Sequence, residues 1–525
     1  MSNHQKPMDR SYYLTATLEE HCLNGDAYVS EETLYNLCKN KMKNLPFSVF
    51  STDLREQLIK NNLRREGRRI YVDRIWRCEE SAAQNLSKLL FLPPLSVPVL
   101  PETMKVGKTT LTEEQRTAVG MALSNGLSVI LGGAGCGKST LIRAIVEQSK
   151  SRCFVVCAPT GKAARNVKDR TGLSARTVHS ACGIGPSDDF LPPVQWTATN
   201  LVIVDEASML SLELLAHLLC RAPSHCRVVL LGDPNQLPSV GAGNVIEDLI
   251  RLGFPHIELT TNHRQEEHNA ALYKNVTEFG RLRFGRELTM DDSFRLVQVD
   301  DDELSGLVVE EAVKRYSRDE SFQVLTTYNK STDFSVRRLN PLIRNCVNPP
   351  TSDKPVISYG GRTFYDGDRV MITRNDRSIG CYNGDVGILV IQDVHRAKKL
   401  KQMGKGRTEL VDVDVFSFTV ALPDGRRPFW RDVEAKEALE DLLLAYVVTA
   451  HKSQGSQYDT ILMPVSMQMQ NMLSRNLFYT AISRATKQVL LFGSDQAVDV
   501  AMQRVLPPRR SVLVSKVQMR QLGVA

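Results

Sequence analysis

Residues 131–140, which read L-G-G-A-G-C-G-K-S-T, decide the fold class of this 525-residue chain. Apolar residues 129–131 precede the stretch, and residues 141–145 follow it with apolar side chains at helical spacing. Strand, glycine-rich loop and helix in this order form the context in which G-x-x-x-x-G-K-[ST] acts as a phosphate-binding loop. A chance glycine-rich turn is the competing interpretation, and it would not bring both flanking elements with it. The stretch therefore predicts a nucleotide-binding α/β domain.

The loop carries the groups that a nucleotide and its metal require. Its four glycines let backbone N–H groups turn inward around phosphate oxygens, and the following helix N-terminus adds partial positive charge. We expect Lys138 to reach the β- and γ-phosphates of ATP, and Ser139 to hold Mg²⁺ through its hydroxyl. The residues of this loop that we expect to bind nucleotide are Gly133, Gly135, Cys136, Gly137, Lys138, Ser139 and Thr140.

The composition is that of a folded protein with several domains. With 42% hydrophobic and 24% charged residues, a chain of this length predicts three or four domains. The net charge of +7 permits a polyanionic partner without requiring one. Eleven irregularly spaced cysteines argue against a disulfide framework and favour packing thiols. Without an apolar signal core or a run of roughly 20 apolar residues, we expect a cytoplasmic protein that does not contact a membrane.

Residues 1–104 form a module of their own. Helical patterns at 31–41 and 52–62 lead into residues 63–72, which alternate as a hairpin turning at Gly67. Helices followed by a hairpin predict a winged-helix-like module, whose arginines would lie on a phosphate-binding surface or on a solvated face. Prolines between 93 and 101 then indicate a stiff linker.

Residues 105–255 alternate strand and helix. Strands at 128–131, 153–158, 200–205 and 227–231 predict a parallel sheet with helices on both faces. Each of these strands ends in a polar cluster, where an open α/β sheet places its ligands. The clusters are the glycine-rich loop, A-P-T-G-K-A-A-R at 158–165, Asp205 with Glu206, and G-D-P-N-Q-L-P-S at 232–239.

Asp205 and Glu206 suit the two tasks of nucleotide hydrolysis. Asp205 can hold Mg²⁺ through its water shell, and Glu206 can take a proton from the attacking water. A helix-capping pair is the structural alternative, and the four apolar residues before Asp205 argue against it.

A second set of alternating elements predicts a second lobe over residues 256–354 and 443–525. Its strands are expected at 257–260, 322–327, 443–449, 460–465 and 488–493, and its helices at 269–280 and 332–346. Residues 355–442 interrupt this lobe with period-two patterns and hairpin turns, which predict a small inserted antiparallel β-barrel. The basic run 396–407 within it is interpreted as a solvated loop, with a phosphate clamp as the alternative.

The order of these motifs resembles the superfamily 1 helicases, and within them the RecD-like 5′–3′ branch. The resemblance covers nearly the whole chain. It rests on the blocks L-T-E-E-Q-R at 111–116, T-V-H-S at 177–180, V-D-E-A-S-M at 204–209, L-G-D-P-N-Q-L-P-S-V-G-A-G at 231–243, L-T-T-N-H-R-Q at 259–265, F-Y-D-G-D-R-V-M-I-T-R-N at 364–375, Y-N-G-D-V-G at 382–387, V-T-A-H-K-S-Q-G-S at 448–456 and Y-T-A-I-S-R-A at 479–485.

The resemblance implies two RecA-like motor lobes with ATP between them, and it assigns roles to single residues. Gln115 would read adenine, Gln236 would join the catalytic set, and Arg264 would reach the γ-phosphate from the second lobe. Arg484 would act as an arginine finger. Residues that would face DNA are Thr160, Lys162, His179, Thr449 and His451. Residues 183–197 occupy the place of a β-hairpin pin that splits the duplex.

The implied function is ATP-dependent 5′–3′ translocation on single-stranded DNA with unwinding of duplex DNA, in repair, recombination or replication. Single strands and junctions between single- and double-stranded DNA would be the partners, and the N-terminal module is a possible protein-binding site. Two alternatives stay open: a translocase or RNA remodeller that does not unwind DNA, and a motor subunit of a nuclease complex. From residues 1–104 we expect no counterpart of the longer N-terminal extension that many RecD-like proteins carry, and Cys136 replaces the more usual threonine.

Overall fold

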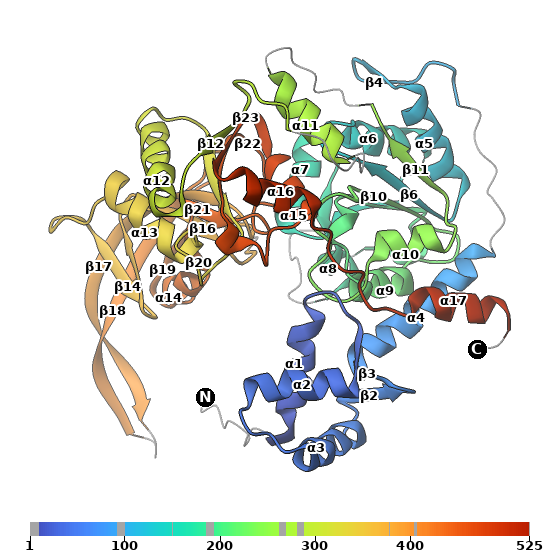
Figure 1. The fold of residues 1–525 in the computed structure, drawn as a ribbon, viewed down its shortest axis with the longest axis horizontal. Coiled ribbons are helices and arrows are strands. Elements are labelled where there is room, and N and C mark those ends of the chain that lie inside the picture. Colours follow the sequence, from blue (N-terminus) through green and yellow to red (C-terminus); the bar gives the residue numbers. More distant parts are fainter. Residues whose placement is uncertain are drawn as a thin grey trace.

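A computed structural model describes residues 10–91, 100–149, 151–184, 194–261, 269–280, 288–376, 378–403 and 407–523. Two parallel sheets with their helices lie side by side, an antiparallel sheet extends from one of them, and an N-terminal module packs below the other (Figure 1). Within these ranges, no helix combines the length and the apolar character needed to cross a bilayer.

The first lobe is built on a six-stranded parallel sheet in the order β11-β6-β10-β9-β7-β8. Its strands are β6 (Leu127–Gly132), β7 (Phe154–Ala158), β8 (Ala175–Thr177), β9 (Leu201–Val204), β10 (Arg227–Gly232) and β11 (His256–Leu259). The central strands are buried along almost their whole length, as expected when helices cover both faces. The predicted strands at 128–131, 153–158, 200–205 and 227–231 are confirmed.

Helices of the first lobe follow these strands. They are α5 (Glu113–Ser124), α6 (Lys138–Ser149), α7 (Gly161–Thr171), α8 (Val178–Cys182), α9 (Leu212–Arg221) and α10 (Val245–Arg251). Because β6, β10, β9 and β7 are neighbours and parallel, their carboxyl ends share one edge of the sheet. The four polar clusters predicted from the sequence therefore gather at that edge.

Strand β11 was predicted to open the second lobe, and this placement is wrong. β11 pairs in parallel with β6, with His256 opposite Val129 and Leu259 opposite Gly132. After α10 the chain turns at Gly253, whose φ of 82° favours glycine, and returns along the free edge beside β6. Leu259 is buried in the first-lobe core, so this edge strand belongs to the first sheet.

The second lobe has a five-stranded parallel sheet in the order β12-β23-β22-β13-β21. These strands are β12 (Phe294–Gln298), β13 (Phe322–Thr326), β21 (Val447–Thr449), β22 (Tyr458–Val465) and β23 (Ala485–Gly493). Its helices are α11 (Ala270–Gly280), α12 (Asp301–Ser317), α13 (Val336–Val347), α15 (Arg475–Ile482) and α16 (Asp495–Gln503). Neither β12 nor α12 was predicted, although Leu304, Val308 and Ala312 mark the buried face of α12 at helical spacing.

The insertion contains a five-stranded antiparallel sheet in the order β19-β18-β17-β16-β20. Its strands are β16 (Arg369–Ile372), β17 (Val386–Met403), β18 (Arg407–Ala421), β19 (Phe429–Arg431) and β20 (Leu442–Leu444). The hairpin of β14 (Val356–Tyr359) with β15 (Arg362–Tyr365) precedes this sheet, and α14 (Asp432–Glu440) lies between β19 and β20. The predicted period-two strands are confirmed, whereas closure into a barrel stays a prediction because β19 and β20 end the sheet order.

The basic run 396–407 was predicted to be a solvated loop, and this is wrong. Most of it belongs to a long two-stranded arm in which β17 and β18 extend far beyond the other strands (Figure 1). The register places Arg396 opposite Asp414 and Lys398 opposite Asp412.

The N-terminal module combines four helices with a small antiparallel sheet in the order β1-β3-β2. Its elements are α1 (Tyr13–Cys22), β1 (Tyr28–Ser30), α2 (Glu31–Lys41), α3 (Phe47–Ile59), β2 (Leu63–Glu66), β3 (Arg69–Val72) and α4 (Asp73–Leu90). The predicted helix at 31–41 and the hairpin at Gly67, with φ of 58°, are confirmed.

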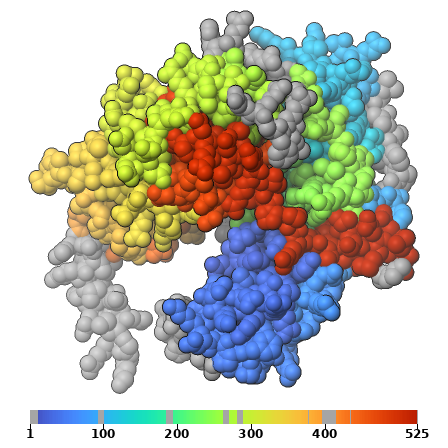
Figure 2. All heavy atoms as spheres, viewed as in Figure 1, coloured from blue at the N-terminus to red at the C-terminus, as the bar shows by residue number. Residues whose placement is uncertain are grey.

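Helix α17 (Leu513–Gln521) was assigned to the second lobe, but it packs on α4 of the N-terminal module. Lys516 is buried there and forms ion pairs with Glu80 at 2.6 Å and Glu79 at 3.5 Å. The buried leucine and valine at 513 and 517 add apolar contact. The segment that leads to α17 crosses the face of the molecule between the second lobe and the N-terminal module (Figure 2).

Candidate nucleotide site and DNA-facing surface

The glycine-rich loop leaves β6 and ends where α6 begins at Lys138. Gly135 and Gly137 have φ of 92° and 80°, a backbone region that other residues rarely adopt. The ammonium of Lys138 donates a hydrogen bond to the carbonyl oxygen of Gly133 at 2.9 Å and another to that of Gly132. The lysine is thus held over the mouth of the loop, where phosphate oxygens would replace the two carbonyl groups.

Gln115 lies under the loop and braces it. Its side chain is 3% exposed and forms a capping box with Thr112 at the start of α5. The same amide donates to the carbonyl oxygen of Cys136 at 3.2 Å. The glutamine therefore fixes the loop backbone, and contact with adenine stays a prediction.

Asp205 and Glu206 follow β9 at the same sheet edge. Burial and the adjacent Glu206 raise the pKa of Asp205, and the nearby Lys138 opposes this rise. Glu206 has a φ of 52°, which costs on the order of 1–3 kcal/mol for a residue with a side chain. Its Oε2 is buried with no hydrogen-bond partner among the described residues. Such strain and such an unpaired oxygen are typical of a catalytic carboxylate.

Asp233, which the sequence argument did not single out, lies at the centre of the site. Burial raises the pKa of its carboxyl group, and Lys138 opposes the rise. The carboxylate accepts from the Asn235 backbone N–H at 3.1 Å and from the Gln236 side-chain amide at 3.3 Å. The other end of that amide, Gln236 Oε1, is buried and lacks a partner in the described part of the chain.

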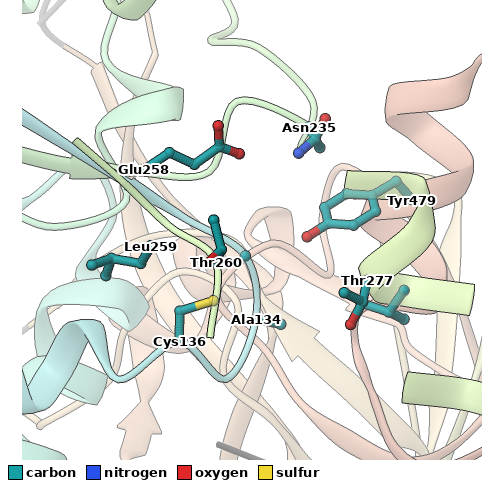
Figure 3. A pocket seen from close by; sticks show the side chains of 10 residues that line it. Ala134, Cys136, Asn235, Glu258, Leu259, Thr260, Thr277 and Tyr479 are labelled. Carbon is teal, nitrogen blue, oxygen red and sulfur yellow. The ribbon is translucent and has the colours of Figure 1, made fainter. Parts of the chain in front are cut away.

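The second lobe reaches this cluster through α15. The Tyr479 hydroxyl donates to Asp233 Oδ2 at 2.7 Å, and Thr480 Oγ1 accepts from the Leu237 N–H at 2.8 Å. Asn476 donates to the carbonyl oxygens of residues 235 and 236, both at 3.2 Å. The pocket beside the loop is lined from both lobes, with Tyr479 pointing toward Ala134 (Figure 3). The nucleotide site is therefore an interface between lobes.

Arg484 follows α15 and is 4% exposed. Its guanidinium donates to the Thr480 carbonyl at 3.0 Å and to the Ser483 hydroxyl at 3.2 Å, both neutral acceptors. It forms no ion pair within the described ranges, and its charge lowers the pKa of nearby Tyr479 against the larger effect of burial. A buried cation without an anion suits a phosphate ligand. The other predicted arginine, Arg264, lies outside the described residues.

The residues present fit ATP and Mg²⁺. The glycine-rich loop and Lys138 would bind the phosphates, and the Ser139 hydroxyl and the Asp205 carboxylate would bind the metal. The unpaired oxygens of Glu206 and Gln236 offer acceptors for an attacking water. No separate group of three His, Cys, Asp or Glu side chains in the described ranges suits a metal ion.

Residues expected to face DNA start at α7. Thr160 caps this helix, because its hydroxyl accepts from the Ala163 N–H at 3.2 Å. Lys162 crosses to the inserted sheet and donates to the Gly384 carbonyl at 3.0 Å. Asn166, further along α7, donates to the Gly455 carbonyl of the second lobe. Helix α7 thus contacts the second lobe at Gly455, in the turn that follows β21 and includes His451.

The other residues that were predicted to face DNA differ in how far they are buried. Thr449 is buried, and its hydroxyl accepts from the Lys452 N–H at 3.4 Å. His451 is partly buried, which lowers the pKa of its imidazole. His179 lies on the surface of α8, and partial burial together with the nearby His217 of α9 lowers the pKa of its imidazole. Most of the predicted pin at 183–197 lies outside the described residues, as does Pro186–Asp189 at its expected tip.

The inserted sheet is tied to the first lobe by a charged cluster. Arg165 of α7 forms an ion pair with Asp424 at 2.5 Å, and Arg426 pairs with Asp385 at 2.8 Å. Both guanidinium groups lie over the ring of Tyr382, at 5.9 and 5.4 Å from its centroid. The insertion therefore covers the α7 side of the surface where the DNA-facing residues were predicted.

Most arginines of the N-terminal hairpin have partners inside the chain. Arg64 lies over the Trp76 ring at 4.2 Å, Arg65 pairs with Glu31 at 2.8 Å, and Arg69 pairs with Glu66 at 3.7 Å. These contacts favour a structural role for this face over a phosphate-binding one.

Two parallel-sheet lobes that share a phosphate-binding loop, an acidic pair and an arginine across their interface define a P-loop motor. Three family models match the chain: an AAA domain at residues 110–290, an ATP-dependent RecD-like DNA helicase SH3 domain at 339–401, and a UvrD-like helicase C-terminal domain at 444–492. Over most of its length the chain is similar to RecD-like helicases.

Two curated relatives illustrate the similarity. The chain is 31% identical over 460 residues to the ATP-dependent RecD2 DNA helicase of Deinococcus radiodurans, an alignment that covers 86% of this chain and 59% of that protein. It is 29% identical over 491 residues to the RecBCD enzyme subunit RecD of Mycolicibacterium smegmatis, covering 84% and 81%. A solved structure of Bacteroides Pif1 bound to single-stranded DNA is similar at 21% identity and a TM-score of 0.44, covering 79% of this chain and 98% of that one.

Proposed function

We propose that this chain is an ATP-dependent, Mg²⁺-dependent DNA helicase that moves 5′–3′ along single-stranded DNA and separates duplex DNA. One observation carries the proposal: phosphate-binding, acidic and arginine groups from two lobes converge on one interface. Lys138 and Asp205 come from the first lobe, and Arg484 comes from the second. A site shared in this way couples hydrolysis to lobe movement, because the interface is complete only when the lobes are closed.

Each residue of the interface has a proposed task. Lys138 neutralises the phosphates, Ser139 and Asp205 hold Mg²⁺, and the metal when bound neutralises charge that develops on the phosphates. Glu206 takes the proton of the attacking water, helped in its orientation by Gln236. Arg484 stabilises the transition state from the second lobe, together with Arg264. The partnerless oxygens Glu206 Oε2 and Gln236 Oε1 support these two assignments.

Single-stranded DNA would cross both lobes along the α7 side. Helix α7, which begins after Thr160 and includes Lys162, contacts the second-lobe turn that follows Thr449, so a strand along this side would contact both lobes. Changes in lobe spacing would then move the strand. His179 is proposed to extend this surface along the first lobe.

The proposed architecture assigns residues 1–104 to a winged-helix-like module and 355–442 to a small β-barrel. The two motor lobes comprise residues 105–354 and 443–525, except that α17 belongs with the N-terminal module. A protein partner would bind at this module. We also propose a cytoplasmic location.

A second candidate function is that of a motor subunit. The relative from Mycolicibacterium smegmatis is described as a subunit of the RecBCD enzyme, and the alignment covers 81% of it. A chain that works in this way would need its partners for activity.

Stimulation of ATP hydrolysis by different nucleic acids tests the proposal. We expect single-stranded DNA to raise turnover of the purified chain more strongly than duplex DNA or RNA, because only an unpaired strand fits across both lobes. Steady-state rates at saturating ATP give the comparison. Stronger stimulation by duplex would indicate a double-strand translocase, and stimulation by RNA alone an RNA remodeller. If none of the three nucleic acids stimulated ATP hydrolysis by the purified chain, the result would favour a motor subunit that needs its partners.

A further inference from the structure

Tyr479 is a buried residue of the nucleotide site whose hydroxyl group has polar contacts with the first lobe. The residue lies on α15 of the second lobe and is 1% exposed. Its hydroxyl points into the pocket beside the glycine-rich loop (Figure 3) and donates to Asp233 Oδ2 of the first lobe at 2.7 Å. Burial raises the pKa of Tyr479 well above its ordinary value, and the backbone N–H of nearby Ala134 opposes this rise. One oxygen therefore lies where the second lobe, the loop and the carboxylate after β10 meet.

The fit around this hydroxyl is tight. A Cβ atom at Gly133 would lie 3.1 Å from the Tyr479 oxygen, so a glycine at this position lets the tyrosine approach the loop. The Ala134 N–H is one of the backbone donors that a loop of this type offers to phosphate oxygens. In this structure, the Tyr479 hydroxyl therefore lies beside a donor that a terminal phosphate would use.

The partner of Tyr479 also holds a predicted catalytic residue. Asp233 Oδ2 accepts from the Tyr479 hydroxyl and from the Gln236 amide, so any loss of the first bond changes the charge available to the second. The backbone of residues 235–237 is in turn bound to Asn476 and Thr480, the neighbours of Tyr479 on α15. A displacement of Tyr479 would therefore change the surroundings of Gln236 in two ways, through Asp233 and through the backbone of residues 235–237.

We propose that Tyr479 is the residue that distinguishes ATP from ADP, by exchanging its bond to Asp233 for a bond to the terminal phosphate of ATP. This inference rests on the proposed nucleotide site and adds a residue to it. ADP leaves the Tyr479–Asp233 bond in place, since it has no third phosphate. ATP supplies a charged acceptor, frees Asp233 and allows Gln236 to turn toward the attacking water.

Tyr479→Phe tests the exchange, because it keeps the buried ring and removes only the hydroxyl. Binding of fluorescent ADP is measured directly. Binding of the non-hydrolysable analogue AMP-PNP is measured by its ability to displace the bound fluorescent ADP. The variant should bind AMP-PNP about 10-fold more weakly, which matches the loss of one hydrogen bond to a charged group. Its affinity for ADP should stay unchanged. Equal changes for both nucleotides, or no change for either, would contradict the proposal.

Asp233→Asn gives a second test, in which the affinity for AMP-PNP should rise and not fall. A neutral amide accepts more weakly than a carboxylate, so the tyrosine hydroxyl is released more easily to the phosphate. We expect the binding of AMP-PNP to tighten more than the binding of ADP, so that the preference for the triphosphate rises. A merely structural tyrosine would make both variants weaken both nucleotides. Weaker AMP-PNP binding by Asp233→Asn would overturn the exchange.

Tyr458→Phe serves as the matched control. Tyr458 lies on β22 of the same lobe, and its hydroxyl is buried without a hydrogen-bond partner among the described residues. Both nucleotide affinities of this variant should equal those of the unmodified chain. The binding assay also separates the two proposals: a chain that binds nucleotides but shows no DNA-stimulated hydrolysis would refute the helicase function and leave the tyrosine exchange testable.

Discussion

Lys138→Ala should abolish ATP hydrolysis while leaving the affinity for single-stranded DNA unchanged. The Lys138 ammonium lies at the mouth of the glycine-rich loop, held by the carbonyl groups of Gly132 and Gly133. Phosphate oxygens would take over both hydrogen bonds and gain a full positive charge. Without it, four negative charges of ATP would face the acidic groups Asp205 and Asp233 with no cation from the loop.

Two assays check this result. Phosphate release in the presence of single-stranded DNA should fall to background, and anisotropy of a labelled oligonucleotide should report an unchanged Kd. Lys108→Ala is the control, since this lysine is exposed on the first lobe at the turn between β4 (Lys105–Val106) and β5 (Thr109–Thr110), outside the proposed DNA path, and should leave both values unaltered. A Lys138→Ala variant that loses DNA binding and hydrolysis together would show that the lysine stabilises the lobe as a whole.

Arg484→Ala should lower turnover by roughly 10³-fold, the effect typical of an arginine finger, which corresponds to about 4 kcal/mol of transition-state stabilisation. Arg484 is buried against neutral acceptors only, so its charge is available to a developing phosphate anion. Nucleotide binding should stay near normal because the glycine loop and Lys138 supply most contacts with the ground state.

Arg475→Ala is the matched control for this variant. Arg475 is also buried on α15, but its guanidinium donates to the Phe279 carbonyl at 2.7 Å, away from the glycine loop. Its loss should lower the melting temperature and leave kcat largely intact. If Arg484→Ala reduced ATP affinity and kcat by equal factors, the finger role would be wrong.

The motor core could be predicted from the sequence because its signals are local. A glycine loop between an apolar strand and a helix, and polar clusters after buried strands, depend on neighbouring residues. The four clusters were therefore expected at one edge of the sheet, and β6, β10, β9 and β7 place them there.

Pairing across long sequence distances could not be predicted in the same way. β11 has no internal signal that selects the β6 edge over the second sheet. The contact between α17 and α4 joins segments far apart in the sequence, and it depends on Lys516 among acidic residues and on the buried Leu513 and Val517. The Tyr479–Asp233 bond spans 246 residues, and each partner alone is an ordinary polar residue in a motif.

The direction of movement tests the central claim most directly, because loop, acidic pair and arginine occur in motors that run either way. A short segment in the first lobe, the block at 448–455 and a modest insertion in the second lobe favour 5′–3′ movement. The 42 residues between β7 and β9 leave no room for an inserted domain, which needs at least about 50.

Unwinding of two tailed duplexes gives the measurement. Each has the same base-paired segment and a single-stranded tail, either 5′ or 3′, and Lys138→Ala serves as the inactive control. With ATP and Mg²⁺, we predict that the chain separates the duplex with the 5′ tail and not the one with the 3′ tail, although both tails stimulate ATP hydrolysis. Efficient unwinding from the 3′ tail alone would contradict the proposed 5′–3′ helicase.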